Sequence, residues 1–172
     1  VKRRVSKPVT TGETWDIWLK HPELVREVDY IAAHILPYWE GMPANETVKY
    51  ALGRYDALRA AYPGKRIVIA EFGWPSQGYN YQRADPGPVL QAEIVRTFVA
   101  EAARRGISFN IIEAFDQPWK VNEGSVGAYW GLFDADRYLK FPLEGKVERK
   151  MFFQRLGLAL AIGALISFFG LI

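Results

Sequence analysis

The chain has 172 residues, of which 24% are charged and 15% aromatic, with a formal charge of +3 and no cysteine. This length fits one domain or part of a larger one, and the composition is not that of a disordered chain. The small positive charge gives little support for a nucleic-acid partner. The lack of cysteine excludes disulfides, thiolate metal ligands and cysteine nucleophiles.

Strand-like and helix-like segments alternate along the chain. Spacing of apolar residues by three and four predicts one helix from Asn45 to Tyr62 and a second from about Pro88 to Arg105. This alternation predicts right-handed βαβ units and an α/β fold. No glycine-rich turn follows a strand, so we expect no dinucleotide or phosphate cofactor. The predicted strands lie within residues 7–14, 29–39, 66–72 and 107–115.

Carboxylates and tryptophans follow the carboxyl ends of these strands. Glu13, Glu71 and Glu113 end three of them, and Glu40 comes shortly after the second. Loops at this edge build the active site of a TIM barrel. Indole rings can stack on sugar rings, and paired carboxylates cleave glycosidic bonds, although ordinary packing is the alternative for any single tryptophan. The six tryptophans of this edge are Trp15, Trp18, Trp39, Trp74, Trp119 and Trp130.

Four stretches carry a family resemblance. AEFGWPSQG, from Ala70 to Gly78, resembles the nucleophile motif of glycoside hydrolase family 17, the β-1,3-glucanase family. FDQPWKVNEGSVGAYWGLF, from Phe115 to Phe133, is similar to the loop after strand eight in its bacterial branch. TTGETWDIWLKHPEL and HILPYWEG resemble the ends of strands five and six. The resemblance implies that residues 1–147 are the C-terminal half, strands five to eight, of a TIM (β/α)8 barrel.

The resemblance also implies roles for individual residues. Glu71 would be the nucleophile of a retaining mechanism, acting on β-1,3-linked glucan. The acid/base glutamate would precede Val1, because the Asn45–Glu46 pair starts a predicted helix. We therefore expect this stretch alone to be inactive, with a non-catalytic glucan-binding half-barrel as the alternative.

The remaining candidates would contact substrate. Tyr38 would hold the nucleophile, and Lys120 would pair with one of the glutamates, for which a structural ion pair is an equal alternative. His34 is expected to be a core residue, and no metal site is expected. The predicted substrate-binding residues are Glu13, Trp15, Tyr38, Trp39, Trp74, Glu113, Trp119, Lys120, Glu123 and Trp130.

Residues 148–172 are predicted to form a basic flank and a truncated transmembrane helix. The uncharged run 156–172 would span roughly 25 Å as a helix, against about 30 Å for a bilayer core. A buried core helix is the alternative. With a membrane helix the chain would resemble bacterial β-glucan synthases and transglucosylases, which are sometimes attached to a glycosyltransferase. The expected location is then the bacterial inner membrane, with the catalytic domain in the periplasm. The basic flank would instead favour a cytoplasmic location for the residues before the helix, so the membrane topology stays open. Whether the enzyme hydrolyses glucan or transfers it to another sugar also stays open.

Overall fold

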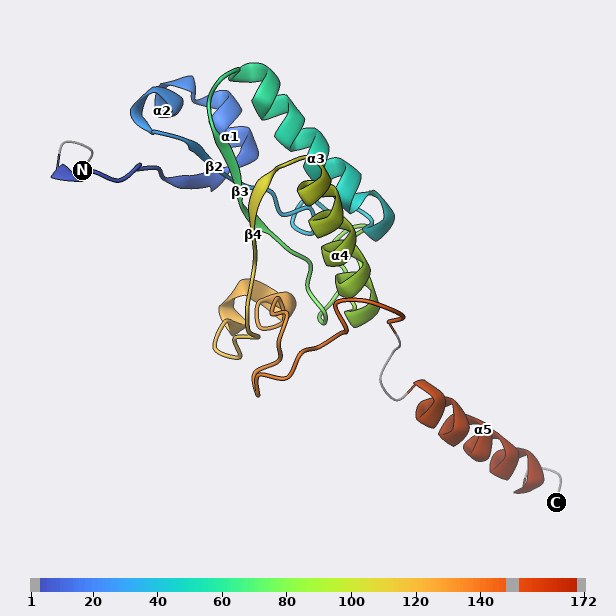
Figure 1. The fold of residues 1–172 in the computed structure, drawn as a ribbon. Coiled ribbons are helices and arrows are strands. Elements are labelled where there is room, and N and C mark those ends of the chain that lie inside the picture. The colour runs from blue at the N-terminus through green and yellow to red at the C-terminus, as the bar shows by residue number, and fades with distance from the viewer. Residues whose placement is uncertain (1–3, 148–151, 170–172) are drawn as a thin grey trace.

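A single parallel sheet organises the computed structural model, which describes residues 4–147 and 152–169. The strands are hydrogen-bonded in chain order, and each pairs in parallel with the next (Figure 1). The predicted α/β class is therefore confirmed. The strands are β1 (Gly12–Thr14), β2 (Ile31–His34), β3 (Ile67–Phe72) and β4 (Ser108–Ile111).

Helices connect the strands, as parallel pairing requires. The two long predicted helices are present, and Figure 1 shows α3 and α4 beside each other. Two six-residue helices between β1 and β2 were not predicted, because each is too short to show a clear helical period. The helices are α1 (Trp15–Lys20), α2 (Pro22–Glu27), α3 (Ala44–Ala61), α4 (Pro88–Arg104), the 3-10 helix η2 (Val121–Val126) and α5 (Phe152–Phe169).

Apolar side chains fill the layer between the sheet and its helices. Phe72 of β3 stacks on Phe98 of α4 with ring centroids 3.6 Å apart. Trp18 is fully buried, and its indole nitrogen donates to the carbonyl of Ala32 at 3.1 Å. The tryptophan expected on the rim in α1 therefore belongs to the core and fixes α1 against β2.

A bulge in β3 changes the face of the sheet on which the side chains at its carboxyl end lie. Ala33 pairs with Ile69, but the next residue of β2, His34, pairs with Glu71. The pairing with β4 shows the same offset between Ile69 and Phe72. Because side chains alternate along a strand, one extra residue moves Glu71 off the helix-covered face that holds Ile69. Glu71 instead shares a face with His34.

The C-terminal helix does not support the predicted transmembrane span. In the described residues no helix is both long and apolar enough to cross a bilayer. Helix α5 begins at Phe152 and includes Arg155, so its uncharged described part, 156–169, is only about 21 Å long. Residues 170–172, and residues 148–151 of the predicted basic flank, lie outside the described residues. Figure 1 shows α5 apart from the sheet.

Candidate functional site

Glu71 and His34 face each other at the carboxyl edge of the sheet. Nδ1 of His34 lies 3.4 Å from Oε2 of Glu71, and the two side chains are 27% and 34% exposed. On the other side, the His34 ring lies over Gly12 of β1, where an added Cβ would come within 2.5 Å of Nε2. The bulge in β3 and the glycine in β1 together make room for this pair.

The expectation that His34 is a core residue is wrong. Its neighbours Ala33 and Ile35 are fully buried against the helices, whereas His34 is partly exposed on the opposite face. Strand alternation alone could have separated His34 from Ala33 and Ile35. The contact with Glu71 could not have been predicted so simply, because it depends on the bulge in the neighbouring strand.

Glu113 follows β4 and is held by side chains of the loop after it. Its Oε2 accepts hydrogen bonds from Lys120 Nζ, at 3.0 Å, and from the amide of Gln117. The predicted pairing of Lys120 with a glutamate is thus confirmed. The other oxygen, Oε1, is buried and has no hydrogen-bond partner in the described part of the chain. A buried acceptor left without a donor is one that a ligand hydroxyl could satisfy.

A groove of about 460 Å³ adjoins His34 at the ends of β1 and β2. Trp39 lines it, is 40% exposed, and is stacked on Trp130 with ring centroids 6.1 Å apart. Trp15 forms another part of the lining, and its indole nitrogen donates to Oε1 of Glu40 at 2.9 Å. The groove therefore combines two indole rings with carboxylates, which suits the apolar faces and hydroxyls of a sugar.

Two side chains of α3 hold Trp15 and Glu40 in place in the lining of the groove. The Arg54 guanidinium lies 4.4 Å from the Trp15 ring centroid and 4.3 Å from that of Tyr50. The Tyr50 hydroxyl donates to Glu40. Burial, with Glu40 beside it, raises the pKa of Tyr50 to about 12. Trp15 and Glu40 are thus held from the helix layer.

Three predicted site aromatics lie in the core instead of on the rim. Trp74 is fully buried and donates to the carbonyl of Asp85 at 3.1 Å, and Trp130 is also buried. Tyr38 does not hold Glu71, because its hydroxyl donates to the carbonyl of Tyr79 at 2.8 Å. Burial raises the pKa of Tyr38. Close packing of Trp74, Trp130 and Tyr38 around the loops shapes the site without offering a face to a ligand.

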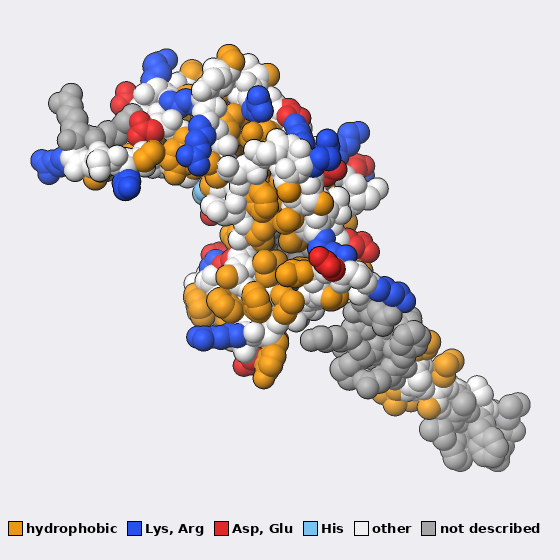
Figure 2. All heavy atoms as spheres, viewed as in Figure 1, with side chains coloured by type: hydrophobic (Ala, Val, Ile, Leu, Met, Phe, Trp, Pro, Cys, Tyr) orange, Lys and Arg blue, Asp and Glu red, His pale blue; other side chains and the backbone are white. Residues whose placement is uncertain are grey.

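The other predicted contacts are scattered. Glu13 pairs with Ala33 in the sheet, so the register places it on the face opposite to Glu71. Trp119 is 72% exposed in the loop after β4, and Glu123 is exposed in η2. Figure 2 shows hydrophobic side chains gathering over β4 and the loop that follows it. The structure thus brings Glu71 together with His34, and Glu113 with Lys120, but leaves Glu13 and Glu123 outside these pairs.

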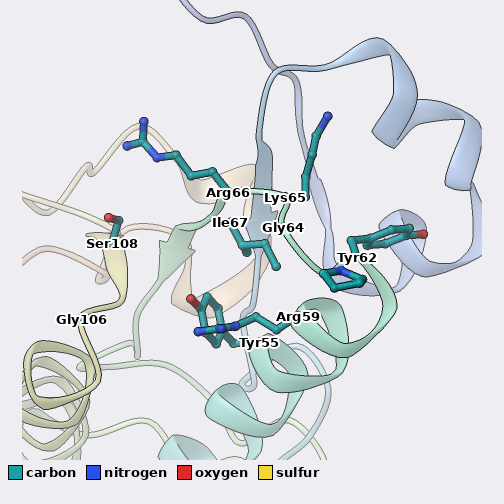
Figure 3. Close-up of a pocket in the computed structure, with 10 residues that line it drawn as sticks. Tyr55, Arg59, Tyr62, Gly64, Lys65, Arg66, Ile67, Gly106 and Ser108 are labelled. Atoms are coloured by element: carbon teal, nitrogen blue, oxygen red, sulfur yellow. The ribbon is translucent and has the colours of Figure 1, made fainter.

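A second cavity, of about 450 Å³, lies at the opposite edge of the sheet, at the amino ends of β3 and β4 (Figure 3). Its lining includes Arg59, Lys65 and Arg66. Figure 3 shows Lys65 and Arg66 pointing in different directions, so these charges do not converge on one point. Among the described residues, no group of three or more His, Cys, Asp and Glu could hold a metal ion.

TIM-barrel enzymes carry their active sites at the carboxyl edge of a parallel sheet, which is the edge where this chain has Glu71 and the aromatic groove. The sequence profile of the BtgE/BtgC glycoside hydrolase domain matches residues 1–131. The chain therefore belongs to this family of glycoside hydrolase domains.

Relatives and solved structures agree with that assignment. Over 144 residues the chain is 27% identical to a glucan 1,3-beta-glucosidase of Schizosaccharomyces pombe, covering 79% of this chain and 45% of the relative. It is 30% identical to a probable beta-glucosidase btgE of Aspergillus fumigatus over 130 residues, covering 74% of this chain and 22% of that one. The crystal structure of a glycoside hydrolase family 17 beta-1,3-glucanosyltransferase from Rhizomucor miehei superposes with a TM-score of 0.72 at 28% identity, covering 80% of this chain and 51% of the other. The chain thus spans about half or less of these fungal proteins.

Proposed function

We propose that this chain is part of a retaining glycoside hydrolase or transglycosylase that acts on β-1,3-linked glucan, with Glu71 as nucleophile. The observation that carries the proposal is the bulge that turns Glu71 onto the open face of the sheet, beside His34. The groove lined by Trp15 and Trp39 adjoins the same edge. The names of the relatives, glucan 1,3-beta-glucosidase and beta-1,3-glucanosyltransferase, support the substrate class.

In the proposed reaction an oxygen of the Glu71 carboxylate attacks the anomeric carbon of the scissile linkage. The bond to the leaving glycosidic oxygen breaks, a second carboxylic acid protonates that oxygen, and a glycosyl ester remains on Glu71. Attack on the ester by water gives hydrolysis, and attack by a sugar hydroxyl gives transglycosylation. In both outcomes the acid, now a carboxylate, takes the proton of the attacking hydroxyl.

The second carboxylate is proposed to lie in the part of a complete barrel that these 172 residues do not include. Support comes from the share of the Rhizomucor miehei chain that is covered, 51%, and from a parallel sheet whose four strands follow chain order. Glu46 is a poor alternative, because α3 begins at Ala44 and Glu46 is exposed there, 3.5 Å from Arg83. Glu113 already accepts hydrogen bonds from Lys120 and Gln117 at one oxygen, an arrangement that suits a hydrogen-bond acceptor better than an acid.

Substrate contacts are proposed for the residues around the groove and the loop after β4. Trp39 and Trp15 would provide stacking faces, and Oε1 of Glu113 would accept a sugar hydroxyl. Trp119, strongly exposed, would extend the surface along the chain of the glucan. The described residues give no support for attachment to a membrane or to a glycosyltransferase. A periplasmic location at a bacterial inner membrane stays a prediction from the resemblance.

The proposal is tested by incubating the full-length polypeptide with laminari-oligosaccharides and separating the products by length. Shorter products alone would indicate hydrolysis, and longer products would indicate transfer. The Glu71→Gln variant should abolish both, while a Glu27→Gln variant, changed at the exposed end of α2, should not. Binding without turnover by a well-folded full-length protein would favour a glucan-binding role instead. Residues 1–172 alone are expected to show no turnover.

A further inference from the structure

We infer that His34 is a positioning residue that orients the carboxylate of Glu71; this inference rests on the function proposed above. The backbone pairing of β2 with β3 places His34 beside Glu71. His34 and Glu71 are register partners on adjacent parallel strands, and the amide of Ile35 donates to the carbonyl of Glu71 at 2.9 Å. The hydrogen-bonded sheet therefore fixes the distance between the Cα atoms of His34 and Glu71.

The His34 ring lies close to Glu71 and is also confined on its other side by β1. The space above Gly12 is occupied by the imidazole, since a Cβ there would lie 2.5 Å from Nε2 and 3.0 Å from Cε1. Gly12 and Thr14 of β1 share the face of His34, and Thr14 lines the groove with it. With Nε2 directed over β1, Nδ1 is the nitrogen left to face Glu71.

The separation of 3.4 Å between Nδ1 and Oε2 is a close contact but longer than a good hydrogen bond. Such contacts at catalytic groups commonly tighten when substrate binds. A proton on Nδ1 would then be donated to Oε2, which leaves Oε1 as the oxygen that attacks the anomeric carbon. His34 would act through Glu71 and would not itself exchange a proton with the substrate.

The role that competes with this one is simple space filling between β1 and β3. The two roles differ in whether the donor at Nδ1 matters. His34→Leu keeps much of the ring volume and removes the donor, whereas His34→Asn places an amide N–H near the position of Nδ1. His21, the other histidine, pairs with Glu23 at 2.8 Å on the exposed end of α1 and gives a matched control variant, His21→Leu.

The readout is the rate at which a 2-deoxy-2-fluoro-laminaribiosyl fluoride labels Glu71 in the full-length protein, followed by mass spectrometry of the digested peptide. In this step a Glu71 oxygen bonds to the anomeric carbon and fluoride leaves, so no acid is needed to protonate the leaving group. We expect labelling of His34→Leu to be about 10-fold to 100-fold slower than wild type. His34→Asn should recover most of the rate, and His21→Leu should match wild type.

Equal labelling rates for His34→Leu and wild type, with the label on Glu71, would overturn the inference and leave the proposed function standing. A slow His34→Asn variant with an unchanged unfolding midpoint would also overturn it, because the donor would then not be what matters. Failure of the wild type to be labelled at Glu71 would instead remove the proposed function, and the inference with it.

Discussion

Lys140 donates to Oδ1 of Asp116 at 2.8 Å, and the same oxygen accepts the backbone N–H of Gly131 at 2.8 Å. Both side chains of the ion pair are about nine-tenths buried. Burial lowers the pKa of Lys140, and Asp116 acts against that shift by favouring the charged form. Through these bonds Asp116, near the start of the segment after β4, is joined to Gly131 and Lys140 further along it. The pair therefore helps to fix the loop that carries Glu113 and Lys120.

Asp116→Ala should therefore destabilise the protein strongly, because it leaves the Lys140 charge buried without its partner. Removing one member of a buried pair costs about 3–5 kcal/mol. Urea unfolding followed by tryptophan fluorescence would measure the loss. The matched control is Glu101→Gln in α4, which breaks the exposed pair with Arg104 and should leave the midpoint nearly unchanged. Equal effects of the two variants would show that the buried pair does not hold the loop.

Gly12→Ala should disturb the Glu71 site without touching Glu71. The new methyl group would meet the His34 ring at Nε2, so the ring must move and its contact with Glu71 must change. Turnover of laminari-oligosaccharides should fall by about 10-fold or more. The control is Gly53→Ala in α3, where an added Cβ has open space. That variant should be active and about 0.5–1 kcal/mol more stable. A fully active Gly12→Ala variant would mean that His34 has more freedom than the structure shows.

Trp39 and Trp74 should separate binding from stability. Trp39→Ala removes a partly exposed ring from the groove, so laminaritriose affinity, measured by titration calorimetry, should weaken by about 10-fold or more. Trp74→Ala empties a fully buried position and should lower the free energy of unfolding by about 3–5 kcal/mol. Unchanged affinity in Trp39→Ala would exclude this groove as a sugar site.

The pKa of Tyr50 predicts a loss of stability at alkaline pH. Its value is raised from 10.0 to about 12 in the folded protein, so between these values the folded state keeps a proton that the unfolded state has lost. Raising the pH through this window should therefore favour unfolding. Tyr50→Phe should reduce that slope, as measured by unfolding midpoints from pH 9 to about 12. Identical slopes in variant and wild type would contradict a buried hydroxyl bonded to Glu40.

The sequence determined the order of strands and long helices in this protein, because apolar spacing and β-branched runs are local properties of the chain. It also placed Glu71 at a strand end, and the short block Glu-Phe-Gly-Trp-Pro-Ser indicated a glycoside hydrolase of family 17. The matching glycoside hydrolase domain supports that family, but the relatives found are fungal and do not show the predicted bacterial branch. The glycine of that block can now be explained physically. A Cβ on Gly73 would strike the carbonyl of Ile112 and crowd the Trp130 ring.

Only the tertiary structure decided which of the strand-end residues meet. Whether Glu71 faces the helices or the open side depends on a one-residue bulge relative to two neighbouring strands, which no local pattern encodes. Whether a tryptophan forms a platform or fills the core depends on the loops folded over it, and so Trp39 is partly exposed while Trp74 is buried. The contact of His34 with Glu71 was likewise decided by the tertiary structure, because Glu71 and the glycine that leaves room for the ring lie on strands that are distant in the sequence.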